Sequence, residues 1–249
     1  MAEATYQLDG PLAEATIPSQ TSIPSDPEPG TYVVIDVASF STTVVELLNN
    51  GASYIHITDE RGDEFGFRDE HPEAKIGGGK TDDYEPTEGY DFYNSPSYVQ
   101  SVDVDGRPVA MTSSNGGAAV TDLDTRGGDD VEIYISSMTN AKAIADHLRA
   151  DDAETIAVIA GSNGKPSPED AAGAILFHRY FEENPPTEPE LEMLKTVVTS
   201  GKASKYHDQP DIKHRDLLEY CSAVNTRSVI PKLEDGALVD VAGNGAERE

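Results

Sequence analysis

Short polar loops rich in hydroxyl, amide and glycine residues follow four apolar segments of the sequence. They read SFSTT (39–43), SSNGG (113–117), SSMTN (136–140) and GSNGK (161–165). Such groups at helix N-termini donate hydrogen bonds without adding negative charge, which suits an oxyanion such as phosphate or sulfonate. Any one of these loops is explained more simply by helix capping or a tight turn, but four together favour an anion site. Because one helix end contributes only about 0.3–1 kcal/mol, several loops must converge or a metal ion must help.

Acidic residues close to these loops could bind a divalent cation. Asp36 ends the first apolar run, and Glu169 and Asp170 open the helix that follows the fourth. Mg²⁺ takes oxygen ligands and keeps several waters, so one or two carboxylates suffice. We expect Asp36 to act in catalysis and metal binding, because a charge at the end of an apolar run is costly without a role. Asp170 is the second candidate for both catalysis and metal binding and Glu169 a further catalytic one, although helix capping also explains Asp170.

Several familiar catalytic motifs are absent or incomplete. GGGKT (77–81) lacks the earlier glycine of a P-loop because position 74 is Ala, and the acidic segment after it would abort a helix and repel a triphosphate. DVDGR (103–107) precedes an apolar strand instead of following one, so it is read as a surface turn and not as a phosphatase motif. The sequence contains neither H-E-x-x-H nor G-x-S-x-G. Nucleotide binding, zinc hydrolysis and serine-hydrolase chemistry therefore receive little support.

Alternating strands and helices must position the polar loops. Continuous apolar, β-branched runs predict buried strands at 31–37, 108–112, 131–135 and 155–160. Helical patterns follow at 44–52, with Ser41 or Thr42 as N-cap, and at 118–123, 141–150 and 168–181, with Ser167 as N-cap. This order predicts an α/β fold: a three-layer α/β/α domain with a parallel or mixed central sheet. In such sheets the ligand lies at the carboxyl ends of the strands, so we expect the four loops to converge there.

The composition limits the partners and the compartment. The 249 residues include 46 acidic and 18 basic ones, for a formal charge of -28, which disfavours nucleic acid and anionic membranes as partners. The acid is spread along the chain, as expected for a halophilic cytoplasm, and a single cysteine agrees with a reducing cytoplasm. We expect an extended N-terminal arm at 1–29, a single domain at 30–240 and a flexible tail at 241–249, with no signal peptide or membrane span.

Seven segments, taken in order from Val33 to Val239, resemble the 2-phosphosulfolactate phosphatase family. They are VVIDVASFSTTVVELLNNGA, IGGGK, GYDFYNSPSYV, VAMTSSNGGAAV, SSMTNAKAIADHL, VIAGSNGKPSPED and EYCSAVNTRSVIPKLEDGALV. The resemblance implies a Mg²⁺-dependent phosphatase of the kind used in coenzyme M biosynthesis, acting on a small phosphorylated or sulfonated acid, with a homodimer as one assembly to consider. It also implies a role in substrate binding for Ser41, Thr42, Gly77, Gly78, Lys80, Asp91, Asn94, Ser95, Ser113, Ser114, Asn115 and Gly116.

The sequence departs from the family pattern at three loop positions. Ser39 stands where the family usually has Arg, Gly79 where it has Glu, and Gly117 where it has Thr. Serine cannot replace the two charge-assisted hydrogen bonds of a guanidinium, although losing Arg and Glu together preserves the charge balance. Two hypotheses follow. The first is a Mg²⁺-dependent phosphatase, and the second is a catalytically inactive anion-binding or regulatory protein on the same scaffold.

Overall fold

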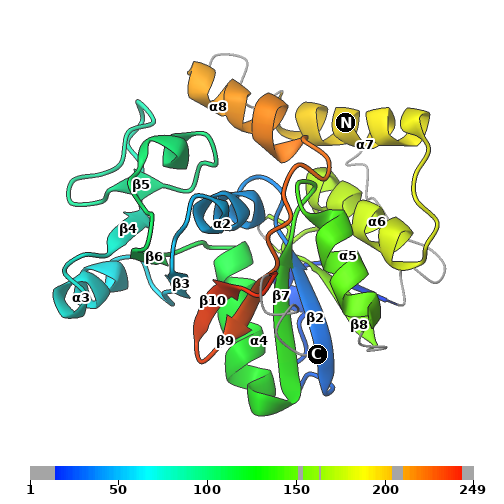
Figure 1. Cartoon of the computed structure of the whole chain (residues 1–249), viewed down its shortest axis with the longest axis horizontal. Helices are drawn as coiled ribbons and strands as arrows, with labels where there is room; N and C mark the ends of the chain where they lie inside the picture. The colour runs from blue at the N-terminus through cyan, green and yellow to red at the C-terminus, as the bar shows by residue number, and fades with distance from the viewer. Residues whose placement is uncertain (1–14, 151–153, 163, 204–209, 243–249) are drawn as a thin grey trace.

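The computed structural model describes residues 15–150, 154–162, 164–203 and 210–242. Within them the chain forms one ten-stranded sheet and seven α-helices, which confirms the α/β prediction (Figure 1). The strands are β1 Thr16–Ile17, β2 Gly30–Ile35, β3 Tyr54–Ile57, β4 Lys75–Gly78, β5 Phe92–Tyr93, β6 Pro108–Met111, β7 Val131–Ser136, β8 Thr155–Ile159, β9 Pro231–Glu234 and β10 Ala237–Asp240. The helices are α2 Phe40–Asn49, α3 Asp63–Glu70, α4 Gly116–Gly127, α5 Ala141–Ala150, α6 Pro168–Phe181, α7 Glu188–Ala203 and α8 Asp211–Arg215.

The sheet consists of two parallel halves joined by an antiparallel hairpin. Its strand order is β1-β8-β2-β7-β9-β10-β3-β6-β4-β5. The first four strands pair in parallel, as do the last four, whereas β7–β9, β9–β10 and β10–β3 pair antiparallel. The sheet is therefore mixed. In a flat sheet of this order the carboxyl ends of the two halves would lie at opposite edges, so only side-chain and backbone contacts can show whether the polar loops meet.

Apolar side chains cover both faces of the central strands. Along β2, Val34 packs into a cluster with α2 and α4, while Val33 and Ile35 pack into a second cluster with α5, α6 and α7. Figure 1 shows the same layers, with α5 and α6 on one side of β2 and β7 and α2 and α4 on the other. The strands are thus buried on both faces, as their uninterrupted apolar runs predict.

Most predicted elements agree with the structure, with local differences. The four predicted strands correspond to β2, β6, β7 and β8, and the four predicted helices to α2, α4, α5 and α6. Helix α2 begins at Phe40 with Ser39 as N-cap, so the prediction of Ser41 or Thr42 as N-cap is wrong. Part of the predicted N-terminal arm forms β1, which pairs in parallel with β8 at the edge of the sheet.

Two further predictions concern the chain termini and membrane-spanning helices. Residues 1–14 of the expected arm and residues 243–249 of the expected tail lie outside the described residues. Among the described residues, no helix combines the length and apolar character that crossing a bilayer requires.

Candidate active site

The carboxyl end of β2 carries a buried carboxylate that contacts the start of α4. The Asp36 side chain is only 4 % exposed, and its Oδ2 accepts a 3.0 Å hydrogen bond from the backbone N–H of Gly116. At the neighbouring strand ends, the hydroxyls of Thr58, after β3, and Thr112, after β6, lie 2.9 Å apart. The loops after β2 and β6 therefore meet, which confirms the predicted convergence of these two loops although their strands run in opposite directions.

The loops after β7 and β8 lie at the same edge as the loop after β2. Parallel pairing aligns Ile35 with Ser136 and with Ile159, so the three strands end together. Asp170 at the start of α6 ties two of these loops, because its Oδ1 accepts from the N–H of Val37 at 2.8 Å and its Oδ2 from that of Gly161 at 3.1 Å. All four polar loops thus gather around the end of β2.

The hydroxyls of Ser41 and Thr42 support the backbone of the first loop. Ser41 Oγ accepts from the N–H of Asp36 at 2.9 Å and donates to the Val34 carbonyl at 3.4 Å. Thr42 Oγ1 donates to the Val37 carbonyl at 2.8 Å. Both residues are fully buried, and their hydroxyls fix the loop that carries Asp36, while their predicted role in substrate binding stays a prediction.

Gly116 is required by the close approach of two chain segments. A Cβ at this position would lie 2.3 Å from Cδ1 of Phe40 and 2.9 Å from Cβ of Asp36. These separations are shorter than real Cβ contacts, so any side chain would displace α2 or the Asp36 loop. Glycine therefore allows the N-terminus of α4 to sit directly against the carboxylate.

The polar side chains before α4 remain available to a ligand. Ser113 and Asn115 are half-buried and Ser114 is exposed. In the part of the chain that the structure describes, none of the three makes a side-chain hydrogen bond, and Asn115 is the N-cap of α4 without a capping bond. They lie at the positive end of a twelve-residue helix, where donors favour an anion.

The two predicted carboxylates of α6 have structural contacts. Ser167 Oγ accepts from the Asp170 N–H at 3.4 Å, which confirms the predicted N-cap. Each carboxylate oxygen of Asp170 accepts a backbone N–H, so this residue joins the loops after β2 and β8. Glu169 is 1 % exposed, and its Oε2 lies 3.1 Å from the place a Cβ would take at Gly201 of α7. The structure thus places Glu169 against α7, while the predicted roles of both residues in catalysis or metal binding stay predictions.

The glycine loop that resembles a P-loop is explained by packing. A Cβ at Gly77 would lie 2.1 Å from the ring of Phe92, and one at Gly78 would lie 2.2 Å from the ring of Tyr90. Both glycines therefore make room for aromatic rings beside β4. Lys80, two residues further, is exposed, and its ammonium nitrogen lies 3.7 Å from the centre of the Tyr84 ring.

In the GYDFYNSP segment, Asp91 and Ser95 bond to other parts of the protein, whereas Asn94 has a side-chain oxygen left unpaired by the residues that the structure describes. Asp91 pairs with Lys75 at 2.9 Å and accepts from the N–H of Ile76 at 3.0 Å, which ties the segment to β4. Asn94 is half-buried, and its Oδ1 is buried with no hydrogen-bond partner among the described residues. Ser95 is fully buried and donates from Oγ to Oδ1 of Asp216 at 2.8 Å.

Asp216 was not predicted from the sequence. It lies in DLLEYC (216–221), where nothing distinguishes it from the other 45 acidic residues of the chain. In the structure it is 1 % exposed, and the pKa of nearby Tyr93 is raised to about 12 by burial and by the charge of Asp216. Asp216 becomes recognisable only in the structure, where the segment that directly follows α8 packs against the turn 94–97.

The donor set at Asp36 suits a hard cation more than a transition metal. Within the described ranges, no group of three or more His, Cys, Asp or Glu side chains is placed to hold a metal ion. A single carboxylate with water and substrate oxygens is nevertheless a common Mg²⁺ environment. Asp36 is thus chemically suited to contribute one ligand to Mg²⁺, and the predicted Mg²⁺ stays a prediction.

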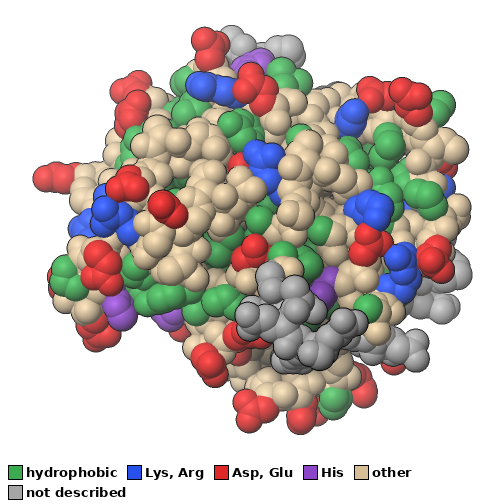
Figure 2. All heavy atoms as spheres, viewed as in Figure 1, with side chains coloured by type: hydrophobic (Ala, Val, Ile, Leu, Met, Phe, Trp, Pro, Cys, Tyr) green, Lys and Arg blue, Asp and Glu red, His purple; other side chains and the backbone are tan. Residues whose placement is uncertain are grey.

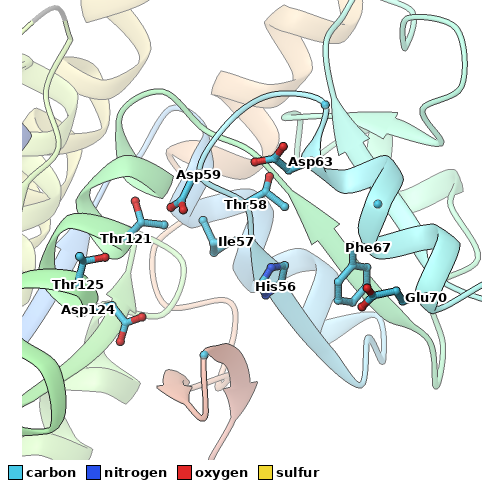
Figure 3. A pocket seen from close by; sticks show the side chains of 13 residues that line it. His56, Ile57, Thr58, Asp59, Asp63, Phe67, Glu70, Thr121, Asp124 and Thr125 are labelled. Carbon is cyan, nitrogen blue, oxygen red and sulfur yellow. The ribbon is translucent and has the colours of Figure 1, made fainter.

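A groove of about 570 Å³ lies beside the site but has a different character. It runs between the end of β3, α3 and α4, and Figure 3 shows side chains from these elements around it. Its described lining includes four carboxylates and no Lys or Arg: Asp59, Asp63, Glu70 and Asp124. None of the predicted site residues lines it, and its charge disfavours an anionic substrate.

Comparisons with known proteins agree with the geometry. The sequence profile of the family described as 2-phosphosulpholactate phosphatase matches residues 17–236. A protein of Deinococcus radiodurans named "Probable 2-phosphosulfolactate phosphatase" is 32% identical over 161 residues, which cover 64% of this chain and 65% of that protein. Proteins with the same name from Symbiobacterium thermophilum and Thermotoga maritima are each 25% identical, over 221 and 229 residues, which cover 83% and 84% of this chain and 92% and 91% of theirs.

The family match extends from β1 to the β9–β10 hairpin and so includes every loop described above. The relatives align collinearly over most of the chain. The chain therefore belongs to the 2-phosphosulfolactate phosphatase family.

Proposed function

We propose that this protein is a Mg²⁺-dependent phosphatase that hydrolyses a small phosphorylated acid, 2-phosphosulfolactate or a close relative. The observation that carries the proposal is the buried carboxylate of Asp36 at 3.0 Å from the Gly116 N–H, at the N-terminus of α4. This arrangement combines a negative charge for a cation and a helix end for an anion at one point. The names of the relatives support the same substrate.

The phosphoryl group binds, in this proposal, at the N-terminus of α4. Ser113 and Ser114 offer hydroxyls, Asn115 offers a carboxamide, and the first turn of α4 adds its positive dipole. Such donors stabilise the charge on the phosphoryl oxygens during transfer, which is most of what the protein must supply in phosphate hydrolysis.

Asp36 has two roles in the proposed reaction. Its carboxylate would hold Mg²⁺, and the bound ion would neutralise phosphoryl charge and help to activate the attacking water. Asp36 is also the proposed acceptor of that water's proton as the new P–O bond forms. The bond from phosphorus to the substrate oxygen then breaks, and that oxygen takes up the proton that Asp36 accepted, which leaves the hydroxy acid and inorganic phosphate and restores the carboxylate.

The remaining loops position these groups. Ser41 and Thr42 fix the Asp36 loop, and Asp170 locks it to the loop after β8. Gly116 lets α4 approach the carboxylate. These contacts fix the loops that carry the proposed reacting groups, and such preorganisation favours electrostatic catalysis.

Phosphate release from three substrates tests the proposal. Purified protein is incubated with 2-phosphosulfolactate, 2-phospholactate and glycerol 2-phosphate, with Mg²⁺ or with EDTA, at low and molar KCl. We expect Mg²⁺-dependent release that is fastest from 2-phosphosulfolactate and is abolished by EDTA. Protein that stays folded and binds sulfolactate but releases no phosphate under any condition would contradict the proposal and identify an anion-binding protein.

A further inference from the structure

We propose that Asp216 is a positioning residue for substrate binding: it locks the turn 94–97 to α8 and so fixes Asn94 and Lys213 at the carboxyl ends of β4 and β5. The proposal rests on the phosphatase function above and adds a residue that binds no substrate itself.

The lock consists of hydrogen bonds inside the protein. Oδ1 of Asp216 accepts from Ser95 Oγ at 2.8 Å and from the N–H of Ser97 at 2.9 Å. Asp216 is 1 % exposed and Ser95 fully buried, so water does not compete for these bonds. The partners are 121 and 119 residues apart in sequence, which means that a single carboxylate connects the β5 half of the sheet to the C-terminal helical segment.

The turn 94–97 lies at the same edge of the sheet as the loop 113–116, which is the proposed phosphoryl-binding loop. Gly78 of β4 pairs with Tyr93 of β5, and Gly77 pairs with Met111 of β6. The residues that follow these three parallel strands, including Asn94 after β5, therefore lie at the same edge of the sheet. Asn94 presents a buried Oδ1 that has no hydrogen-bond partner in the described chain, an arrangement that is unfavourable unless a ligand or water donates a hydrogen bond to it.

The same lock brings two lysines to one aromatic ring. Lys213 lies three residues before Asp216, with its Nζ 4.0 Å from Asp216 Oδ2 and 5.9 Å from the centre of the Tyr84 ring. Lys80 approaches the same ring at 3.7 Å. Two ammonium groups around one ring repel each other, and an acid group of the substrate would relieve that repulsion. The carboxylates of Asp82 and Asp83 in this loop are exposed and so weaken the local positive charge less than buried ones would.

A purely structural role for Asp216 predicts a different result from a positioning role. A structural carboxylate contributes to the melting temperature only, and folded molecules of a variant would bind substrate normally. A positioning carboxylate also sets KM, because a misplacement of about 1 Å in binding groups can cost up to ~100-fold. Asn at position 216 separates the two contacts of the lock, since its carbonyl oxygen can still accept both bonds from Ser95 and Ser97 but its neutral amide no longer pairs with Lys213.

The experiment compares Asp216→Ala, Asp216→Asn and the milder Ser95→Ala with a matched control. Asp240→Ala is the control, because Oδ1 of this exposed residue at the end of β10 also accepts two hydrogen bonds, from the N–H groups of Ile230 at 2.8 Å and Ala242 at 3.0 Å. Kinetics with 2-phosphosulfolactate give KM and kcat. Calorimetric titration with sulfolactate, the reaction product, measures binding without turnover, and a thermal melt on each sample confirms folding.

We expect Asp216→Ala to raise KM and weaken sulfolactate binding at least ~tenfold, and Ser95→Ala and Asp216→Asn, which each lose one part of the lock, to do so by smaller factors. Asp240→Ala should lower the melting temperature and leave KM and binding unchanged. Should Asp216→Ala fail to fold, Ser95→Ala decides. Binding by Ser95→Ala equal to that by Asp240→Ala, or normal binding by a folded Asp216→Ala variant, would overturn the positioning role. If the unmodified protein binds sulfolactate but shows no turnover, the phosphatase function is refuted and the positioning role of Asp216 in binding can still be tested.

Discussion

Replacing Asp36 with Asn tests the centre of the proposed mechanism. Asn has nearly the same size and can still accept the 3.0 Å hydrogen bond from Gly116. It lacks the negative charge that makes a carboxylate oxygen a good Mg²⁺ ligand and a proton acceptor. The substitution therefore separates the chemistry of Asp36 from its place in the fold.

The expected effects differ in size for activity and stability. Loss of one group that stabilises charge in a water-poor site typically costs about 100-fold or more in kcat, or about 2.7 kcal/mol of barrier. Because the hydrogen bond to Gly116 persists, stability should change by only about 1 kcal/mol. We thus expect Asp36→Asn to abolish measurable Mg²⁺-dependent phosphate release while the protein stays folded.

The assay measures phosphate release across a Mg²⁺ titration and a thermal melt on the same sample. Asp240→Asn is the control, because Asp240 also accepts backbone N–H groups but belongs to the β9–β10 hairpin and is exposed. Turnover and Mg²⁺ dependence equal to those of the control would remove Asp36 from the mechanism. A variant that melts far below the control would instead assign Asp36 a mainly structural role.

Four further predictions follow from charge, packing and burial. The melting temperature should rise between about 0.1 and 2 M KCl, because salt screens a chain with a charge of -28 whose carboxylates are spread over the surface in Figure 2; a flat or falling midpoint would refute the halophilic interpretation. Gly116→Ala should lower both kcat and stability, since its Cβ would lie 2.3 Å from the Phe40 ring, whereas Gly117→Ala, at 3.1 Å from Ser113 Cβ, should have a milder effect in the same assays. Burial lowers the pKa of His178 below its ordinary 6.5, so the unfolded chain binds the proton first and stability should decline as the pH falls below about 6.5; denaturant titrations should show a smaller decline in His178→Gln. Burial raises the pKa of Tyr93 to about 12, so stability should fall as the pH rises above 10.0, and alkaline melts of Tyr93→Phe should show a smaller decline, with the rest left to other tyrosines of raised pKa such as Tyr32 and Tyr90.

The central strands were predictable because their environment imposes a simple pattern. β2, β7 and β8 are buried on both faces, and only continuous apolar runs satisfy that environment. β4 and β5 lack such a run: β4 reads KIGG, and its glycines are there to accommodate the rings of Phe92 and Tyr90. The β9–β10 hairpin, which reverses the direction of half the sheet, depends on pairing between segments more than 90 residues apart that no local pattern records.

The same distinction separates the site residues. The contact between Asp36 and the loop 113–117 was correctly predicted, because both follow buried strands. The expected reason, a common strand direction, holds for β2, β7 and β8 but not for β6. Ser41 and Thr42 were predicted to bind substrate. In the structure their hydroxyls form hydrogen bonds with the backbone of residues 36–37, which the sequence could not show because these bonds depend on the conformation of residues 36–42.

Burial, more than residue type, distinguishes the important carboxylates of this chain. Among the described residues, the buried acidic side chains are Asp36, Glu46, Glu64, Glu169, Asp170 and Asp216. A charge removed from water is costly unless donors compensate it, so each buried carboxylate marks a point where the fold supplies such donors. Asp36 faces a helix N-terminus, Asp170 joins two loops of the site, and Asp216 locks the turn that carries Asn94. In a sequence with 46 acidic residues the acidic composition conceals these positions. Glu46 pairs with Arg227 and Glu64 accepts from Tyr90, so burial alone does not define a site, and it is the position of Asp36, Asp170 and Asp216 beside loops that follow strands that supports one there.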